Sequence, residues 1–176
     1  MSDAKDYDVI IVGAGPAGST LAYEMRQFER SVLILEKEYF PRDKPCGGGL
    51  TGKIDSVISF DISHLIEGEI KSISFTRKLK DEISGSTRTS SVKIVKRAEF
   101  DNFLVNRAIK SGAELVQGAK VVEVGKKNDC IFVNTEDKRK YQGKILVGAD
   151  GALGTISKSV LCEKDVPFSF LVALKC

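Results

Sequence analysis

The chain has 176 residues, of which 42% are hydrophobic and 29% charged, and its 27 Lys and Arg against 24 Asp and Glu give a net charge of +3. This composition is typical of an ordinary globular protein, and the length suggests one domain that can bury a core. Because the charge is nearly balanced, the composition argues against a nucleic-acid-binding protein.

The first predicted elements form a strand–helix–strand unit. An apolar strand over residues 7–12 leads into the pattern Gly-x-Gly-x-x-Gly over residues 13–18. A helix with one apolar face is predicted over residues 17–29, and a second strand over residues 32–36 ends in Glu36. The order strand, glycine turn, helix, strand and acid predicts a site for an adenine dinucleotide.

Each part of this unit has a physical reason. The first glycine permits the tight turn, the second lets the backbone approach a diphosphate, and the third lets the helix pack closely on the strand. The phosphates lie at the helix N-terminus, where N–H groups and the helix dipole favour negative charge. Glu36 is placed to accept hydrogen bonds from ribose hydroxyls and would repel a 2′-phosphate. NADP is therefore disfavoured, while NAD and FAD both remain.

A long excursion follows the second strand. Residues 40–49 contain two prolines and three consecutive glycines, so they are predicted to form a loop. The excursion covers residues 41–95, with strand-like segments over residues 69–76 and 91–95. Residues 71–97 hold eight basic and two acidic side chains. These basic residues suit solvated strand edges, and the alternative is a face turned toward anionic lipid.

The chain then returns to the main sheet. A helix is predicted over residues 98–110 and ends at Ser111-Gly112, and a strand over residues 113–116 follows. Short strands separated by polar turns predict an antiparallel meander used as a crossover, followed by a last parallel strand that leads into Gly148-Ala149-Asp150-Gly151. The expected meander strands are residues 120–124, 130–135 and 139–142, and the last parallel strand is residues 144–147.

The predicted fold is α/β, a Rossmann-like FAD-binding domain of the glutathione-reductase and aromatic-hydroxylase type with a β-rich insertion and a β-meander crossover. The glycine loop, the excursion and the meander favour FAD over NAD, because a flavin needs the chain to leave the sheet and wrap an extended cofactor. We expect this domain over residues 1–165, and residues 166–176 as the start of a truncated substrate-domain strand.

The expected location is the cytoplasm, with peripheral contact with a membrane as an open alternative. The N-terminus is polar and unlike a signal peptide, and no apolar run approaches the roughly 20 residues that span a bilayer. The four cysteines include no Cys-x-x-Cys pair, so neither a disulfide framework nor a metal site is expected.

Three segments together resemble the flavin-dependent geranylgeranyl reductase family, within the wider superfamily of aromatic-hydroxylase-like flavoproteins. They are the glycine motif with Glu36, the loop over residues 41–50 (Pro-Arg-Asp-Lys-Pro-Cys-Gly-Gly-Gly-Leu) and residues 95–101 (Val-Lys-Arg-Ala-Glu-Phe-Asp). The Asp-Gly pair at 150 and 151 is similar to a superfamily motif. The Pro-Cys-Gly-Gly-Gly loop is the narrowest of these signals and resembles the archaeal lipid-reductase branch.

The resemblance implies roles for individual residues. The ADP half of FAD would lie on the glycine motif and Glu36, and the flavin would lie beside Arg42 and Cys46. Arg97 would lie near the phosphate and ribityl region of the cofactor. Asp150 and Gly151 would contact the cofactor near its diphosphate. Cys46 is the candidate for a catalytic role. The residues expected to bind the cofactor are Gly13, Gly15, Pro16, Ala17, Gly18, Glu36, Lys37, Arg42, Cys46, Gly47, Gly48, Arg97, Asp150 and Gly151.

Plainer interpretations stay open for several of these residues. Cys46 is alternatively a buried small hydrophobic residue, Arg97 a surface charge, and Asp150 a turn residue or a cap for the next segment. The superfamily pattern after Asp-Gly continues with Ser, and here Gly154 stands at that position. Family members are also roughly twice as long as this chain, so we expect a truncated protein.

The function that the resemblance implies is reduction of C=C bonds in geranylgeranyl chains of lipids or prenyl precursors. The expected partners are an isoprenoid lipid substrate and an external electron donor that reduces the flavin, and no nucleic acid. One alternative is a flavin monooxygenase or halogenase on the same fold. The other is a truncated, inactive fragment that retains nucleotide binding.

Overall fold

The computed structural model describes residues 6–77, 80–86, 92–127, 129–151 and 154–156. These residues belong to two compact units. Among the described residues, one unit comprises residues 6–42 together with those from 101 to 156, and the other comprises those within Asp43–Phe100. The expected strand over residues 166–176 lies outside the described residues.

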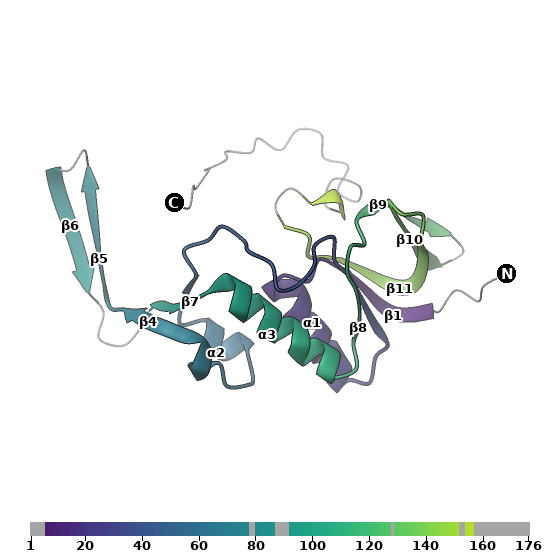
Figure 1. Cartoon of the computed structure of the whole chain (residues 1–176), viewed down its shortest axis with the longest axis horizontal. Helices are drawn as coiled ribbons and strands as arrows, with labels where there is room; N and C mark the ends of the chain where they lie inside the picture. Colours follow the sequence, from purple (N-terminus) through teal and green to yellow (C-terminus); the bar gives the residue numbers. More distant parts are fainter. Residues whose placement is uncertain (1–5, 78–79, 87–91, 128, 152–153, 157–176) are drawn as a thin grey trace. The chain divides into compact units, whose positions relative to one another are not determined.

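A six-stranded mixed sheet forms the centre of the first unit (Figure 1). Four neighbouring strands are parallel and the last two pair antiparallel, as expected of a meander. In spatial order the strands are β8 (Glu114–Val116), β2 (Val32–Leu35), β1 (Asp6–Val12), β11 (Lys140–Gly148), β10 (Cys130–Thr135) and β9 (Val121–Lys127).

Strands β1 and β2 are apolar on both faces because both faces are covered. Alternate residues such as Ile11 and Ile34 pack with Ala22 of helix α1 (Pro16–Gln27) and Val105 of helix α3 (Arg97–Lys110). The other alternate residues join a second cluster with residues of the meander strands, Val133 among them. Strands buried on both faces read as continuous apolar runs, so this packing explains the pattern of residues 7–12 and 32–35.

The predicted fold class is confirmed, with one error in the meander. Residues 139–142 and 144–147 were expected to be separate strands, and they form the single strand β11. Residues 140–143 of β11 pair antiparallel with β10, and residues 142–148 pair parallel with β1. Gly143, which falls between the two expected strands, lies inside β11 opposite Tyr7, where a side chain would press on Ile10.

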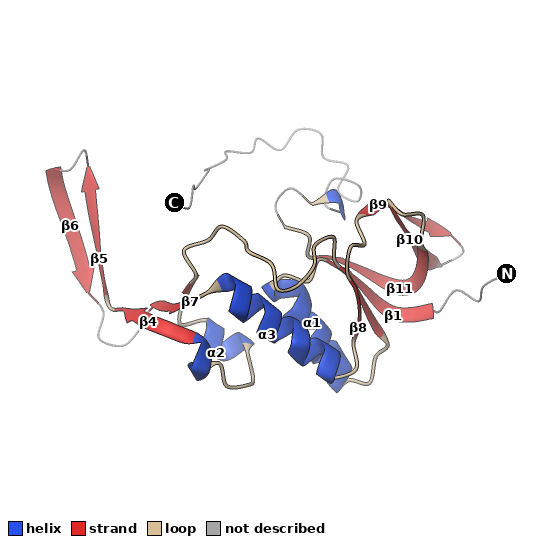
Figure 2. Cartoon of the chain, viewed as in Figure 1, coloured by secondary structure: helices blue, strands red, loops and turns tan. Residues whose placement is uncertain are grey.

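The second unit contains a small three-stranded sheet and a separate hairpin (Figure 2). The expected strand over residues 69–76 is wrong, because the chain leaves the small sheet at Ile70 and enters the hairpin at Ser72. The small sheet has the order β3 (Gly49–Leu50), β7 (Val92–Val95) and β4 (Ile66–Ile70), and the hairpin consists of β5 (Ser72–Arg77) and β6 (Lys80–Ser86). Short helical segments occupy α2 (Ile54–Val57) and η1 (Ser63–Leu65).

Within the residues that the structure describes, none of the helices has the length and apolar character that crossing a membrane would require.

Candidate cofactor site

The three glycines of the motif differ in what surrounds them. Gly13 has a φ of +101°, and a side chain there would collide with the carbonyl oxygen of Ala149. A side chain on Gly18 would collide with the carbonyl oxygen of Gly13. Gly15 is different, since among the described residues beyond its chain neighbours, only Nη2 of Arg42 comes within 4 Å of a Cβ built on it, at 3.6 Å. The first and third glycines are therefore required by the fold, while the second leaves space for a ligand.

Hydrogen bonds hold the turn between β1 and α1 in place. The Gly13 N–H donates to the carbonyl of Leu35 (2.8 Å), and the Ala149 N–H donates to the carbonyl of Val12 (2.8 Å). The buried Ser19 hydroxyl donates to the carbonyl of Ala14 (2.9 Å). The motif is thus tied to its neighbours β2 and β11 before any ligand arrives.

Helix α1 begins directly at this turn. Pro16 is its first residue, where a missing N–H costs no intrahelical bond. Gly15 is the N-cap, and its own lack of a side chain means that it makes no side-chain capping hydrogen bond. Ala17 is exposed in the first turn. The positive end of the helix dipole therefore points toward the space above Gly15.

Glu36 lies beside the motif, as its position after β2 predicts. Its side chain is only 5% exposed. One carboxylate oxygen accepts a hydrogen bond from the Ala14 N–H (2.7 Å) and the other from the Glu38 N–H (3.0 Å). These bonds hold the carboxylate at the end of β2. The adjacent Lys37 is exposed.

Arg42 lies close to the glycine motif and is mostly buried. Its Nη2 is 3.4 Å from Oδ2 of Asp101, and the two side chains are 12% and 1% exposed. The guanidinium lies over the ring of Phe40, 5.0 Å from the ring centre. Its Nε is buried and has no hydrogen-bond partner among the described residues. Asp101 was not predicted as a site residue, because only the docking of α3 brings it to Arg42.

The segment after β11 also contacts the motif. A Cβ on Gly13 would lie 2.9 Å from the Asp150 backbone nitrogen, so Asp150 and Gly13 are neighbours. The Asp150 carboxylate accepts a hydrogen bond from the Ile156 N–H (3.0 Å), which makes Asp150 a cap for the following helical turn. A side chain on Gly154 would collide with this carboxylate, which explains why Gly154 replaces the expected Ser. Gly151 is exposed, with a φ of +85°.

The remaining predicted residues belong to the second unit. Gly48 has a φ of +70° and packs on the carbonyl of Val95, whose N–H donates to the Gly48 carbonyl (3.0 Å). Apart from its chain neighbours, no described residue has an atom within 4 Å of a Cβ built on Gly47. Cys46 is exposed, so the alternative of a buried small residue is wrong. Arg97 is half-buried as the first residue of α3.

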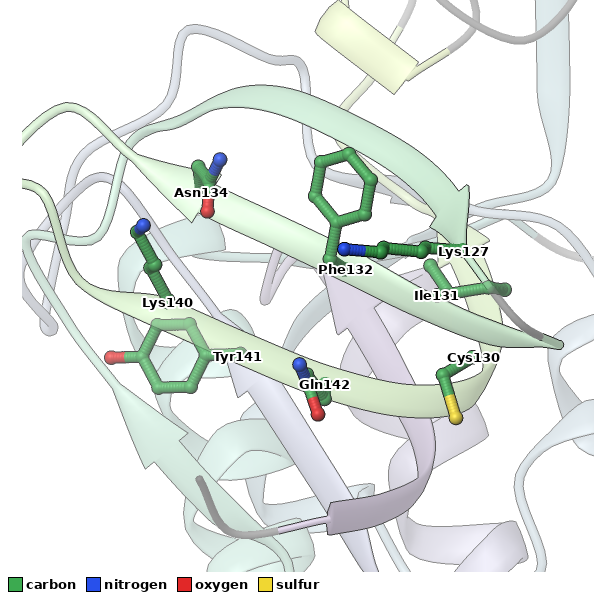
Figure 3. A pocket seen from close by; sticks show the side chains of 8 residues that line it. All are labelled: Lys127, Cys130, Ile131, Phe132, Asn134, Lys140, Tyr141 and Gln142. Carbon is green, nitrogen blue, oxygen red and sulfur yellow. The ribbon is translucent and has the colours of Figure 1, made fainter. Parts of the chain in front are cut away.

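A hollow of about 440 Å³ lies elsewhere, on the meander, and contains none of the predicted residues. Its lining comes from β9, β10 and β11 alone (Figure 3). The ring of Phe132 covers Gly125 on the neighbouring strand. The lining residues are Lys127, Cys130, Ile131, Phe132, Asn134, Lys140, Tyr141 and Gln142.

Comparison with known proteins gives a family and several relatives. A family model described as an FAD binding domain matches residues 6–168. An uncharacterized protein of Methanosarcina barkeri is 38% identical and is matched over 100% of this chain and 45% of its own length. A 1H-pyrrole-2-carbonyl-[peptidyl-carrier protein] brominase of Pseudoalteromonas luteoviolacea is 32% identical over 96% of this chain and 43% of its own length. A geranylgeranyl diphosphate reductase of Rhodobacter capsulatus is 30% identical over 93% of this chain and 42% of its own length.

Among solved structures, a geranylgeranyl bacteriochlorophyll reductase-like protein of Thermoplasma acidophilum has the same fold. It is 24% identical, with a TM-score of 0.71 over 84% of this chain and 40% of its own. The chain thus spans less than half the length of these relatives.

Proposed function

The chain belongs to the family of FAD-binding domains, and from that membership we propose that it takes part in the flavin-dependent reduction of C=C bonds in geranylgeranyl chains. FAD as cofactor is confirmed by the family, and the resemblance to geranylgeranyl reductases is confirmed by the reductase relative of Rhodobacter capsulatus. The observation that carries the cofactor part of the proposal is the buried Glu36 carboxylate, fixed by the Ala14 N–H beside the open space above Gly15. The reductase relative and the Pro-Cys-Gly-Gly-Gly loop support the reaction.

The residues of the first unit fit the adenosine and diphosphate half of FAD. Glu36 would accept hydrogen bonds from the ribose hydroxyls, as an acid at the end of the second strand does in dinucleotide sites. The open side of Gly15 and the N-terminus of α1 would take the diphosphate. The unpartnered Nε of Arg42 leaves a donor for the same anion. Cys46 and Gly47, exposed in the second unit, remain the candidates for the flavin ring.

The division of chemical work follows from these groups. FAD, when bound, supplies the two-electron transfer to the double bond. The residues named here bind and orient the cofactor, and the buried Glu36 carboxylate keeps 2′-phosphorylated nucleotides away through charge repulsion. None of them is assigned as the proton donor.

A second candidate function is halogenation, and the brominase relative favours it. The Pro-Cys-Gly-Gly-Gly loop, which resembles that of geranylgeranyl reductases, favours reduction instead. The product separates the two functions. Saturated prenyl chains formed from geranylgeranyl diphosphate and reduced FAD without oxygen support a reductase. A halogenated product that requires oxygen and bromide supports a halogenase, and no product with either substrate supports the inactive fragment.

Cofactor binding is tested directly with the purified chain. We expect a yellow protein that takes up FAD, with Glu36→Gln binding FAD about tenfold or more weakly, because a charge-assisted hydrogen bond contributes about 1.5–3 kcal/mol. Glu38→Gln is the matched control, since the Glu38 side chain is exposed and only its backbone contacts Glu36. A colourless wild-type protein that ignores added FAD would overturn the site, and equal FAD affinity of Glu36→Gln and wild type would remove Glu36 from it.

A further inference from the structure

Asp101 is a charged side chain in the interior of the first unit that the proposed cofactor contacts do not use. It is 1% exposed, and a buried carboxylate is unfavourable unless it is paired. It forms an ion pair with Arg42, Nη2 to Oδ2, at 3.4 Å. We propose that Asp101 is a positioning residue, which holds the Arg42 guanidinium at the N-terminus of α1 for the diphosphate of the dinucleotide. This inference rests on the proposed function.

The geometry around Arg42 restricts the guanidinium from two sides. Phe40 supports the flat face of the group at 5.0 Å, and the Asp101 carboxylate contacts its edge at 3.4 Å. A free arginine side chain samples many rotamers, and fixing it in advance lowers the entropy lost when it binds a phosphate. Because Asp101 lies on a long, packed helix, it provides a rigid point of attachment.

The restricted guanidinium keeps donors for a ligand. A guanidinium has five N–H donors, and its ion pair with Asp101 is formed through Nη2. Nε is buried without a hydrogen-bond partner among the described residues. Nη2 also lies 3.6 Å from a Cβ built on Gly15, the motif glycine with open space. The guanidinium with the unsatisfied Nε is thus the group that lies beside the open glycine.

Charge explains why an acid is needed behind Arg42. The N-terminus of α1 carries partial positive charge, so a second positive group beside it is unfavourable until an anion binds. Asp101 neutralises part of this charge before an anion binds and leaves Nε without a hydrogen-bond partner among the described residues. A purely structural ion pair would also fix the chain near Arg42 to α3. Loss of such a pair would affect the binding of ligands with and without phosphates alike, whereas loss of a positioning pair would weaken only the ligands with phosphates.

The test compares ADP with adenosine, by calorimetric titration of the full 176-residue chain. We expect Asp101→Asn and Arg42→Gln each to weaken ADP binding about tenfold or more, the usual effect of losing one charge-assisted contact, and to leave adenosine binding unchanged. The double variant should bind ADP no more weakly than Arg42→Gln alone, because Asp101 acts through Arg42. Asp137→Asn, which breaks an exposed pair with Arg139, is the matched control and should bind like wild type.

Several outcomes would overturn the inference. If Asp101→Asn binds ADP as tightly as wild type, or more tightly, Asp101 has no positioning role. The same conclusion follows if the double variant loses ADP affinity by the product of the two single-variant losses. If Asp101→Asn does not fold by circular dichroism, Asp101→Glu replaces it, and the displaced carboxylate must still weaken ADP but not adenosine. A wild-type chain that binds neither FAD nor ADP instead overturns the proposed function itself.

Discussion

At the residue scale, the glycines of the motif at residues 13–18 and of the loop over residues 41–50 include two kinds. Gly13, Gly18 and Gly48 have backbone atoms of another residue where a side chain would lie, so the fold alone requires them. In the part of the chain that the structure describes, and leaving out chain neighbours, a Cβ on Gly15 would meet only the flexible end of Arg42, and a Cβ on Gly47 would meet no atom within 4 Å. The absence of a side chain at these two positions is not explained by packing within the chain, which is the pattern expected where a ligand approaches the backbone.

Another residue-scale feature joins three parts of the central sheet. Asp8 of β1 accepts hydrogen bonds from the Ser31 N–H and hydroxyl (both 3.0 Å), just before β2, and from Lys144 Nζ of β11 (2.7 Å). The hydrogen bond from Lys144, followed by those from Ser31, lowers the pKa of the Asp8 carboxyl well below its usual range. The folded protein therefore favours the charged form of Asp8.

This lowered pKa predicts a pH dependence. The stabilisation is fully present above the unfolded-state pKa of about 3.9, and it is lost as the pH falls through the lower folded-state value. We expect wild type to exceed Asp8→Asn in urea midpoint at pH 7 and pH 5, with the difference shrinking at pH 3 and below. Lys144→Gln should show the same convergence, because it removes the main cause of the shift. A difference that stays constant from pH 7 to pH 2 would contradict the assignment.

At the element scale, β11 shows how a local signal can mislead. The expected strands over residues 139–142 and 144–147 placed a boundary at Gly143, yet the strand continues because it has partners on both sides, β10 and β1. A Cβ at Gly143 would lie 3.0 Å from both the Tyr7 carbonyl oxygen and Cγ1 of Ile10. The glycine is there for the close approach of β1, and not to end the strand.

This interpretation predicts that a good strand former is harmful at position 143. Valine in a strand is normally favourable by up to about 1 kcal/mol relative to poor formers. Gly143→Val should nevertheless destabilise the protein by about 1–3 kcal/mol, because it overpacks the contact with β1. Gln142→Val is the control, since Gln142 is exposed on the same strand and the change should lie within about 0.5 kcal/mol. Equal urea midpoints for Gly143→Val and wild type would restore the interpretation of Gly143 as a strand break.

What the sequence could predict depended on the range of the interactions. The β1–α1–β2 unit and the position of Glu36 beside the glycine motif were predicted correctly because the strand pattern, the glycine turn and the acid are all close in sequence. The pairing of Arg42 with Asp101 was not predicted, because 59 positions separate the two residues and only the docked helix α3 joins them. Likewise, the division of residues 69–76 between two sheets depends on which strand each half pairs with, β7 or β6, and that choice is not local.

At the scale of the whole molecule, the buried apolar residues are concentrated in the first unit. Both core clusters, on the two faces of β1 and β2, are made of residues from this unit. In the second unit, every described residue of β5 and β6 is exposed. Phe75 and Ile83, which lie opposite each other in this hairpin, are 68% and 74% exposed.

This contrast predicts unequal local stability, measured by native-state hydrogen exchange. The amides of β1 and β2 should exchange only through global unfolding, because their strands are buried on both faces. The amides of β5 and β6 should exchange at a free energy near zero, since an isolated two-stranded hairpin is at best marginally stable in water. Hairpin amides as protected as those of β1 would contradict this. Such protection would mean that another surface covers Phe75 and Ile83 in solution. In that case Phe75→Ser should lower the protection of the hairpin amides. If the hairpin is uncovered, Phe75→Ser should leave their exchange unchanged.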